Sequence, residues 1–159
     1  MLKTLAIIIG ILFISANIAY ANNDSFNLPE EKINPGSTLY PLKRLSEKIQ
    51  SKLIFSKVRN VNFQGDLVER RLLELNFIVK NKYLSSLEYS SQRFSAQAGV
   101  FIDGLDSLEN KDSGTTLQRF SNYEDILNNL RDQFPANSSQ WLLLQQNIDT
   151  LNILSEKIS

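Results

Sequence analysis

The sequence predicts an all-α protein, a bundle of about four to five helices with a long second helix at its centre. From Tyr40 onward the apolar residues recur at intervals of three and four, which is typical of helices packed along one face. No alternating apolar and polar run of useful length indicates a strand. The chain also has no Cys. Its stability must therefore come from a hydrophobic core, because disulfides are excluded.

The first helix is expected to begin at Pro41, because proline lacks the N–H group that would be unsatisfied at that position. It should end near Phe55, with Ser56 capping the next helix. Its apolar and polar side chains fall on two different faces, Leu42, Leu45, Ile49 and Leu53 on one and Arg44, Lys48, Ser51 and Lys52 on the other.

The second helix carries the clearest pattern of the chain. A seam with spacings of three and four predicts the side that packs in the bundle: Val58, Val61, Gly65, Val68, Leu72, Leu75 and Val79. Gly65 lies within this seam, where a missing side chain lets a neighbouring helix approach closely. Asp66, Arg70 and Glu74 are spaced by four, and we interpret them as a solvated ladder of charges.

Three further helices are predicted from breaks in the pattern. The segment Ser85-Ser86-Leu87-Glu88 fits a capping box and indicates the start of the third helix. Residues 110–114 form a turn by composition, and residues 135–138 end the fourth helix. Ser138 is the expected cap of the fifth helix. The apolar positions of these helices are Phe94, Ala98, Phe101, Leu105 and Leu108, then Leu117, Phe120, Tyr123, Leu127, Leu130 and Phe134, then Trp141, Leu144, Ile148, Leu151, Leu154 and Ile158.

The N-terminus is typical of a secretory signal peptide. Lys3 is the only charge before Asp24, residues 5–14 are almost continuously apolar, and Ala19-Tyr20-Ala21 supplies a small-residue cleavage site. We expect cleavage between Ala21 and Asn22. The alternative is an uncleaved anchor helix, although a spanning helix needs about 20 apolar residues. The predicted organisation is a signal peptide (1–21), an extended polar leader (22–38) and one helical domain (39–159), which ends in a helical hairpin (111–159).

Composition excludes several kinds of chemistry. The chain has no His or Cys, and its one Met is Met1. The usual general base of serine and cysteine nucleophiles is therefore missing, as are the ligands of haem, blue copper and ordinary zinc sites. Carboxylates remain as ligands for a hard cation such as calcium. Asp103, Asp106, Glu109 and Asp112 are the best cluster, but an EF-hand loop registered on Gly114 would place Lys111 and Phe120 at ligand positions. We interpret the cluster as a solvated helix end and expect no metal or cofactor.

Charge is divided unevenly along a chain whose net charge is zero. Residues 40–82 hold ten Lys and Arg against four Asp and Glu, whereas residues 83–159 hold five against ten. The basic side chains of the first helix could contact an anionic membrane or wall polymer: Lys43, Arg44, Lys48 and Lys52, followed by Lys57 and Arg59. The alternative is that the basic and acidic halves pack together or are merely solvated. Nucleic acid is disfavoured by the expected export.

Two segments resemble a known family. Pro35-Gly36-Ser37-Thr38-Leu39-Tyr40-Pro41-Leu42-Lys43 opens a helix that contains Glu47, and Glu69-Arg70-Arg71-Leu72-Leu73-Glu74 follows in the second helix. Together they resemble the bacterial family catalogued as domain of unknown function 5667, over Pro35 to about Leu75 and loosely over the third helix. The chain departs from that pattern at Thr38 and Gly65. The resemblance implies a location outside the bacterial cytoplasm and no known chemistry.

These observations predict a non-catalytic exported helical domain, periplasmic, cell-surface or secreted, which binds another envelope component or is structural. One alternative is a small chaperone-like or stress-linked envelope protein, which would present an apolar concavity. Another is a hydrolase that uses carboxylates, which would need a cleft with convergent acids. The sequence does not identify the partner or the oligomeric state.

Overall fold

The computed structural model describes residues 31–159, which form helices joined by turns and loops. No strand occurs among these residues, and the predicted all-α bundle is confirmed. The predicted signal peptide, its cleavage site at Ala21 and Asn22 and most of the predicted leader lie outside the described residues. The helices are α2 (Tyr40–Leu53), α3 (Lys57–Lys80), the short 3-10 helix η1 (Leu84–Ser86), α4 (Leu87–Asp106), α5 (Ser113–Arg131) and α6 (Ser139–Ile158).

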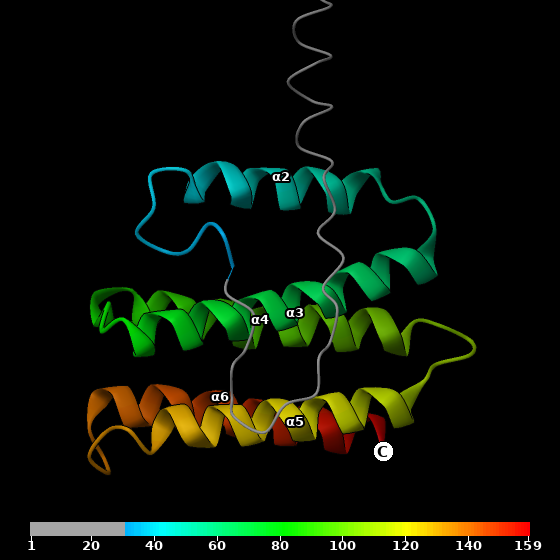
Figure 1. Cartoon of the computed structure of the whole chain (residues 1–159). Coiled ribbons are helices and arrows are strands. Elements are labelled where there is room, and N and C mark those ends of the chain that lie inside the picture. The colour runs from blue at the N-terminus through cyan, green and yellow to red at the C-terminus, as the bar shows by residue number, and fades with distance from the viewer. Residues whose placement is uncertain (1–30) are drawn as a thin grey trace, which may run out of the picture.

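The helices are arranged in three layers. Figure 1 shows α2 as an outer layer, α3 and α4 next to it, and α5 and α6 farthest away. Helix α3 packs on α4 and α5, and α6 packs on the same two helices, so α3 to α6 form a four-helix bundle. Helix α2 contacts α3 on the outside of this bundle.

Local sequence signals explain most helix boundaries. Pro41 lies in the first turn of α2. Ser56 caps α3, and the Ser138 hydroxyl accepts a hydrogen bond from the Trp141 backbone N–H at 3.2 Å to cap α6. The break before α4 is also where the sequence predicts it. The predicted capping box is wrong, however, because α4 follows directly on η1 and its N-cap residue is Ser86, whose side chain makes no capping hydrogen bond.

A tight turn leads the chain into α2. The Ser37 backbone N–H donates to the Asn34 carbonyl oxygen at 3.1 Å, which places Pro35 and Gly36 at the two central positions. Gly36 has a φ of 97°, a conformation that side-chain-bearing residues rarely adopt. The Pro-Gly pair therefore determines the direction in which the chain enters α2.

The hydrophobic core lies inside the four-helix bundle. Most of the predicted seam of α3 is buried there, including Val61, Val68, Leu72 and Leu75. Val58 is the exception: it is 55% exposed, because it lies in the first turn of α3 at the end of the bundle, beside the exposed Phe55. Among the described residues, the core cluster draws its side chains from α3 to α6 and none from α2. Helix α2 must therefore be held by other forces.

Candidate functional site

The face of α2 that meets the bundle is polar. Tyr40, Lys43, Glu47 and Ser51 are spaced by three and four, so they follow one side of the helix. Each of them makes a hydrogen bond or an ion pair with α3. A helix on a bundle usually turns its apolar stripe inward. Helix α2 is the reverse, since its polar stripe is the one that packs.

Glu74 is the centre of the contact between α2 and α3. Its side chain is fully buried, and its Oε2 accepts a hydrogen bond from the Tyr40 hydroxyl at 2.8 Å. Its Oε1 accepts from Lys43 Nζ at 3.0 Å and also from Arg71 Nη1. Both carboxylate oxygens therefore have donors, as a buried charge requires. The predicted solvated ladder is wrong at Glu74, because α2 covers that side of α3.

Arg71 connects Glu74 to the second carboxylate of the contact. Its side chain is fully buried, and its Nη2 donates to Glu47 Oε2. Arg44 Nη1 donates to the same oxygen at 3.1 Å. Arg70 Nη1 lies 3.8 Å from Glu47 Oε1, which is an ion pair but too long for a hydrogen bond. We call Tyr40, Lys43, Glu47, Arg71 and Glu74 the charge network.

The charge network keeps the Tyr40 hydroxyl protonated. Burial, together with the adjacent Glu74 carboxylate, raises the pKa of Tyr40 well above its usual range. Tyr40 therefore stays a neutral donor to Glu74. The guanidinium of Arg93, from α4, lies 5.2 Å from the centre of the Tyr40 ring and covers it. In a buried ion pair such as Arg71 and Glu74, removing one partner costs about 3–5 kcal/mol, because the other charge loses its compensation.

Polar contacts continue along α2 beyond the charge network. Gln64 Nε2 donates to the Ser51 hydroxyl at 2.8 Å, and Asn60 Nδ2 donates to the Ser51 carbonyl oxygen at 2.7 Å. Gln97 of α4 then donates to Gln64 Oε1 at 2.7 Å. The attachment of α2 is therefore polar over most of its length, and its geometry is defined by specific partners.

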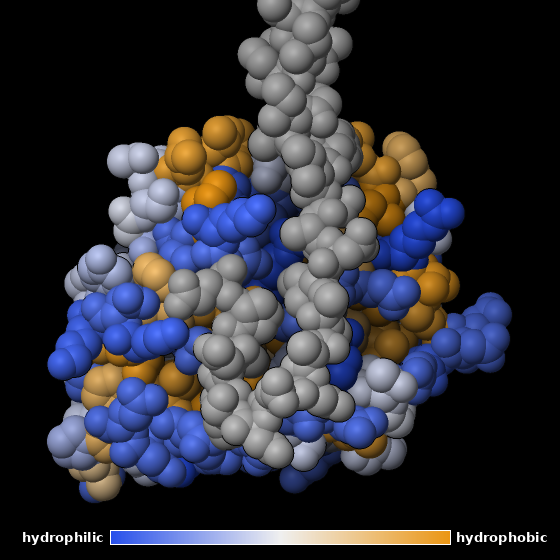
Figure 2. Space-filling model, viewed as in Figure 1, coloured by the Kyte–Doolittle hydropathy of each residue, from blue (hydrophilic) through white to orange (hydrophobic). Residues whose placement is uncertain are grey.

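The apolar side chains of α2 point away from the bundle. They are between 49% and 56% exposed, and we call them the outer face: Leu42, Leu45, Ile49 and Leu53. Leu39 and Phe55 extend it at the two ends, and Phe55 is 93% exposed. Figure 2 shows hydrophobic surface over both ends of α2, along the edge of the molecule that this helix forms. Contiguous exposed apolar surface is often found at interaction sites.

The four basic residues predicted for an anionic contact do not lie together. Lys43 points inward, with 9% of its side chain exposed, and besides Glu74 it contacts Glu31 at 3.2 Å. Arg44 is partly exposed and pairs with Glu47. Lys48 and Lys52 are exposed and adjoin the outer face. Three of the four therefore remain at the surface of α2.

The acidic cluster near the end of α4 is occupied by local partners. Asp103 Oδ1 accepts from Lys157 Nζ at 2.8 Å, and Asp106 Oδ1 accepts from Lys111 Nζ at 2.6 Å. Asp112 caps α5 by accepting from the Thr115 backbone N–H. Within residues 31–159, no group of three or more acidic, His or Cys side chains is arranged to hold a metal ion. In the same range, no helix is long and apolar enough to cross a membrane.

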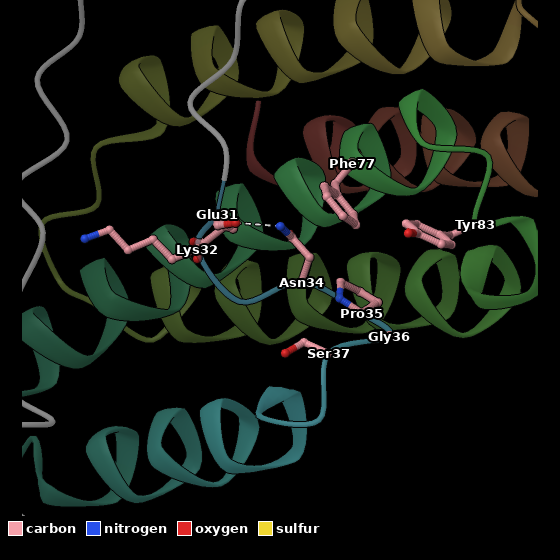
Figure 3. Close-up of a pocket in the computed structure, with 8 residues that line it drawn as sticks. All are labelled: Glu31, Lys32, Asn34, Pro35, Gly36, Ser37, Phe77 and Tyr83. Atoms are coloured by element: carbon pink, nitrogen blue, oxygen red, sulfur yellow. Dashed lines mark hydrogen bonds between the residues drawn. The ribbon is translucent and has the colours of Figure 1, made fainter.

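A shallow hollow of about 650 Å³ lies beside the turn before α2. Figure 3 shows its lining, which is Glu31, Lys32, Asn34, Pro35, Gly36, Ser37, Phe77 and Tyr83. The rings of Phe77 and Tyr83 stack with centres 5.8 Å apart. Asn34 Nδ2 donates to the Glu31 carbonyl oxygen, a contact between two residues of this loop that are three positions apart. The lining mixes polar and apolar surface, comes mostly from the loop at residues 31–37, and offers no convergent set of reactive groups.

A family match supports the resemblance seen in the sequence. The model of DUF5667, a domain of unknown function, matches residues 32–137. The chain belongs to this family. The match runs from the turn before α2 to the loop after α5, so it contains the whole charge network and extends well beyond the Pro35 to Leu75 segment on which the resemblance rests. A search of curated proteins and a search of solved structures returned no match.

The charge network was not predicted from the sequence, although a signal for it exists. Leu67, Arg71, Glu74 and Ile78 are spaced by four, three and four, so the two charges occupy a stripe that is apolar at both ends. Charged residues inside an apolar stripe indicate burial with a partner. The sequence does not name that partner, because Tyr40 and Lys43 lie more than thirty positions earlier.

Proposed function

We propose that the protein is a non-catalytic domain of the bacterial cell envelope that binds another envelope component through the outer face of α2. The observation that carries this proposal is the orientation of the helix. Its polar side chains hold it on the bundle, so its exposed apolar side chains have no structural task in the folded domain. Keeping four half-exposed aliphatic side chains in water forgoes the stabilisation that their burial would give, about 25 cal/mol per Å² of surface.

The contents of the charge network support a binding role over a catalytic one. Glu47 and Glu74 are the buried carboxylates of the network, and each accepts hydrogen bonds from Arg71. A carboxylate that works as a general acid or base needs a free oxygen facing substrate, whereas Glu47 Oε1, which accepts no hydrogen bond, is buried. The absence of His and Cys removes the common nucleophile and base pairs. These observations favour a structural role for the ionised groups.

The chaperone-like alternative is less well supported. Such a protein would need an apolar concavity, whereas the exposed apolar residues of α2 follow the convex side of a helix. The hollow of Figure 3 combines the rings of Phe77 and Tyr83 with the charged and polar residues of the loop at 31–37, so it is not an apolar concavity. We therefore retain the specific binding face as the proposed function.

Site-specific photocrosslinking in the producing cell tests this proposal. A photoreactive amino acid at Leu45 or Ile49 should form a defined adduct, which mass spectrometry identifies as protein or lipid. The matched control is the same amino acid at Tyr89 of α4, which is 71% exposed on another element. Adduct formation at Tyr89 with equal yield, or no adduct at either position of α2 in folded protein, would contradict the proposal.

A further inference from the structure

We propose that the component bound by the outer face of α2 is an anionic membrane surface, on which the helix lies flat. This inference rests on the proposed function and names the chemistry of the occupant. Three observations carry it: the sign of the charge around the outer face, the spacing of basic and apolar side chains, and the position of α2 on the bundle.

The exposed charged side chains of α2 and of the turn that follows it are all basic. Residues 39–59, all of which the structure describes, contain six Lys and Arg and one acidic residue, Glu47. Glu47 is 3% exposed and is held by Arg71 and Arg44. The single carboxylate is therefore turned inward, and the charges beside the apolar residues are positive. A polybasic surface is attracted to anionic lipid headgroups.

The arrangement of side chains fits a helix that lies in a membrane interface. The apolar positions are spaced by three, four and four, so they form one stripe, and Lys48 and Lys52 each precede an apolar residue of that stripe, Ile49 and Leu53. Lysine at this border can place its stem along the apolar surface and its ammonium group among the headgroups. Phe55, almost fully exposed, extends the apolar surface beyond the helix end. Interfacial helices combine Lys and Arg with Leu and Phe in this way.

The position of α2 allows the whole stripe to reach a flat surface. Figure 1 shows α2 along one edge of the molecule, with the other helices on its opposite side. A plane that touches the outer face would therefore meet α2 along its length before it meets the bundle. The polar attachment described above keeps the stripe turned outward.

The charge disfavours a second copy of the chain as the occupant. Pairing two outer faces would bring Lys48 and Lys52 of both copies close together with no exposed acidic partner on either helix. In the predicted exported form, the segment that precedes residue 31 is a poor cover as well. Positions 22–30 contain only two large apolar residues, Phe26 and Leu28, for an outer face of four.

Vesicle flotation tests the proposal with the chain from Asn22 to Ser159, which is the predicted exported form and contains every residue of the bundle core. The probes are vesicles of phosphatidylglycerol mixed with phosphatidylcholine, and vesicles of phosphatidylcholine alone. We expect binding to the anionic vesicles, at least tenfold weaker binding to the neutral ones, and weakening by salt. Circular dichroism verifies that each variant is folded.

Two pairs of variants separate the two parts of the surface. Lys48→Gln with Lys52→Gln should weaken binding by roughly 30-fold, since each basic residue near an anionic surface contributes about fivefold. Leu45→Ser with Ile49→Ser, in a chain that keeps both lysines, should abolish binding. The matched controls are Lys80→Gln with Lys82→Gln at the end of α3, and Leu142→Ser with Ile153→Ser on α6, where the side chains are 51% and 67% exposed. Both controls should bind as the unaltered chain does.

Each other outcome overturns the membrane proposal in a recognisable way. No flotation, together with a protein adduct from Leu45 in cells, would leave the proposed function standing with a protein as occupant. Flotation that is lost in the lysine pair but unchanged in the Leu45 and Ile49 pair would show that the apolar side chains add nothing. The occupant would then be a polyanion such as a wall polymer. A dimer that disappears in the Leu45 and Ile49 variant would indicate a second copy. If the protein neither floats with the vesicles nor forms any adduct, both proposals are contradicted.

Discussion

Replacing Gly65 in α3 measures how closely the helices of the bundle approach. A Cβ atom at this position would lie 3.1 Å from Phe101 Cε2 and 3.2 Å from Arg119 Nη1. Arg119 is partly exposed and can shift, but the Phe101 ring is 5% exposed and packs edge-on against Phe120, with ring centres 6.2 Å apart. The ring of Phe101 therefore limits what can be added at Gly65.

Gly99 in α4 provides the matched control, because a Cβ atom there would meet nothing within 4 Å. Gly99→Ala should raise the free energy of unfolding by about 0.5–1 kcal/mol, the gain expected for Gly to Ala inside a helix. Gly65→Ala should lose most of that gain to its contact with Phe101. Gly65→Leu should lower the free energy of unfolding by about 1–3 kcal/mol, because the added atoms overpack the interface.

Urea unfolding followed by far-ultraviolet circular dichroism gives these free energies, provided that the slope with denaturant stays constant. The reasoning is refuted if Gly65→Leu is as stable as the unaltered chain while Gly99→Ala is more stable. Gly65 would then not face Phe101, and α3 would have to be rotated so that another side of the helix faces the bundle.

Three further predictions concern the charge network, the alkaline limit of stability and the N-terminus. Glu74→Leu should lower the free energy of unfolding by about 3–5 kcal/mol, because Arg71 and Lys43 lose the carboxylate that they share and the buried Tyr40 hydroxyl loses its acceptor; urea melts that show less than 1 kcal/mol would place the Glu74 side chain in water. Burial raises the pKa of Tyr123 from 10.0 to about 12, so its neutral form stabilises the fold below pH 10 and about 2–3 kcal/mol is lost as the pH rises toward 12. Tyr123→Phe should make that decline shallower, and an unchanged slope in urea melts across this range would contradict the assignment. N-terminal sequencing of exported protein should begin at Asn22, whereas a sequence beginning at Met1 would favour the anchor.

Much of the secondary structure follows from short-range chemistry that the sequence displays. Pro41, Ser56 and Ser138 act through the backbone groups of their own helix ends, so their roles could be recognised without knowledge of the neighbours. The seam of α3 was predictable for a similar reason. Its period is the period of the helix, and an apolar seam that runs along most of a long helix is usually buried in a bundle. Val58 belongs to the seam but is exposed, because it lies at the end of the bundle and the sequence pattern does not show where the bundle ends.

The candidate site depended on tertiary structure. The period of α2 shows that Leu45 and Ile49 share one face while Lys43 and Glu47 share another, but it does not show which face packs. That choice depends on Arg71 and Glu74, two charges on α3 that need partners once they are buried. Apolar residues on α2 could not satisfy them.

The sequence by itself therefore determined the five α-helices, most of their ends and the apolar stripes, because these depend on residues a few positions apart. Only the tertiary structure decided that Glu74 is buried, that Lys43 points inward, and that the outer face of α2 meets the surroundings. The physical reason is that burial is a property of pairs of surfaces. The free energy of placing Glu74 in the interior depends on Tyr40 and Lys43, which the chain brings to it from another helix.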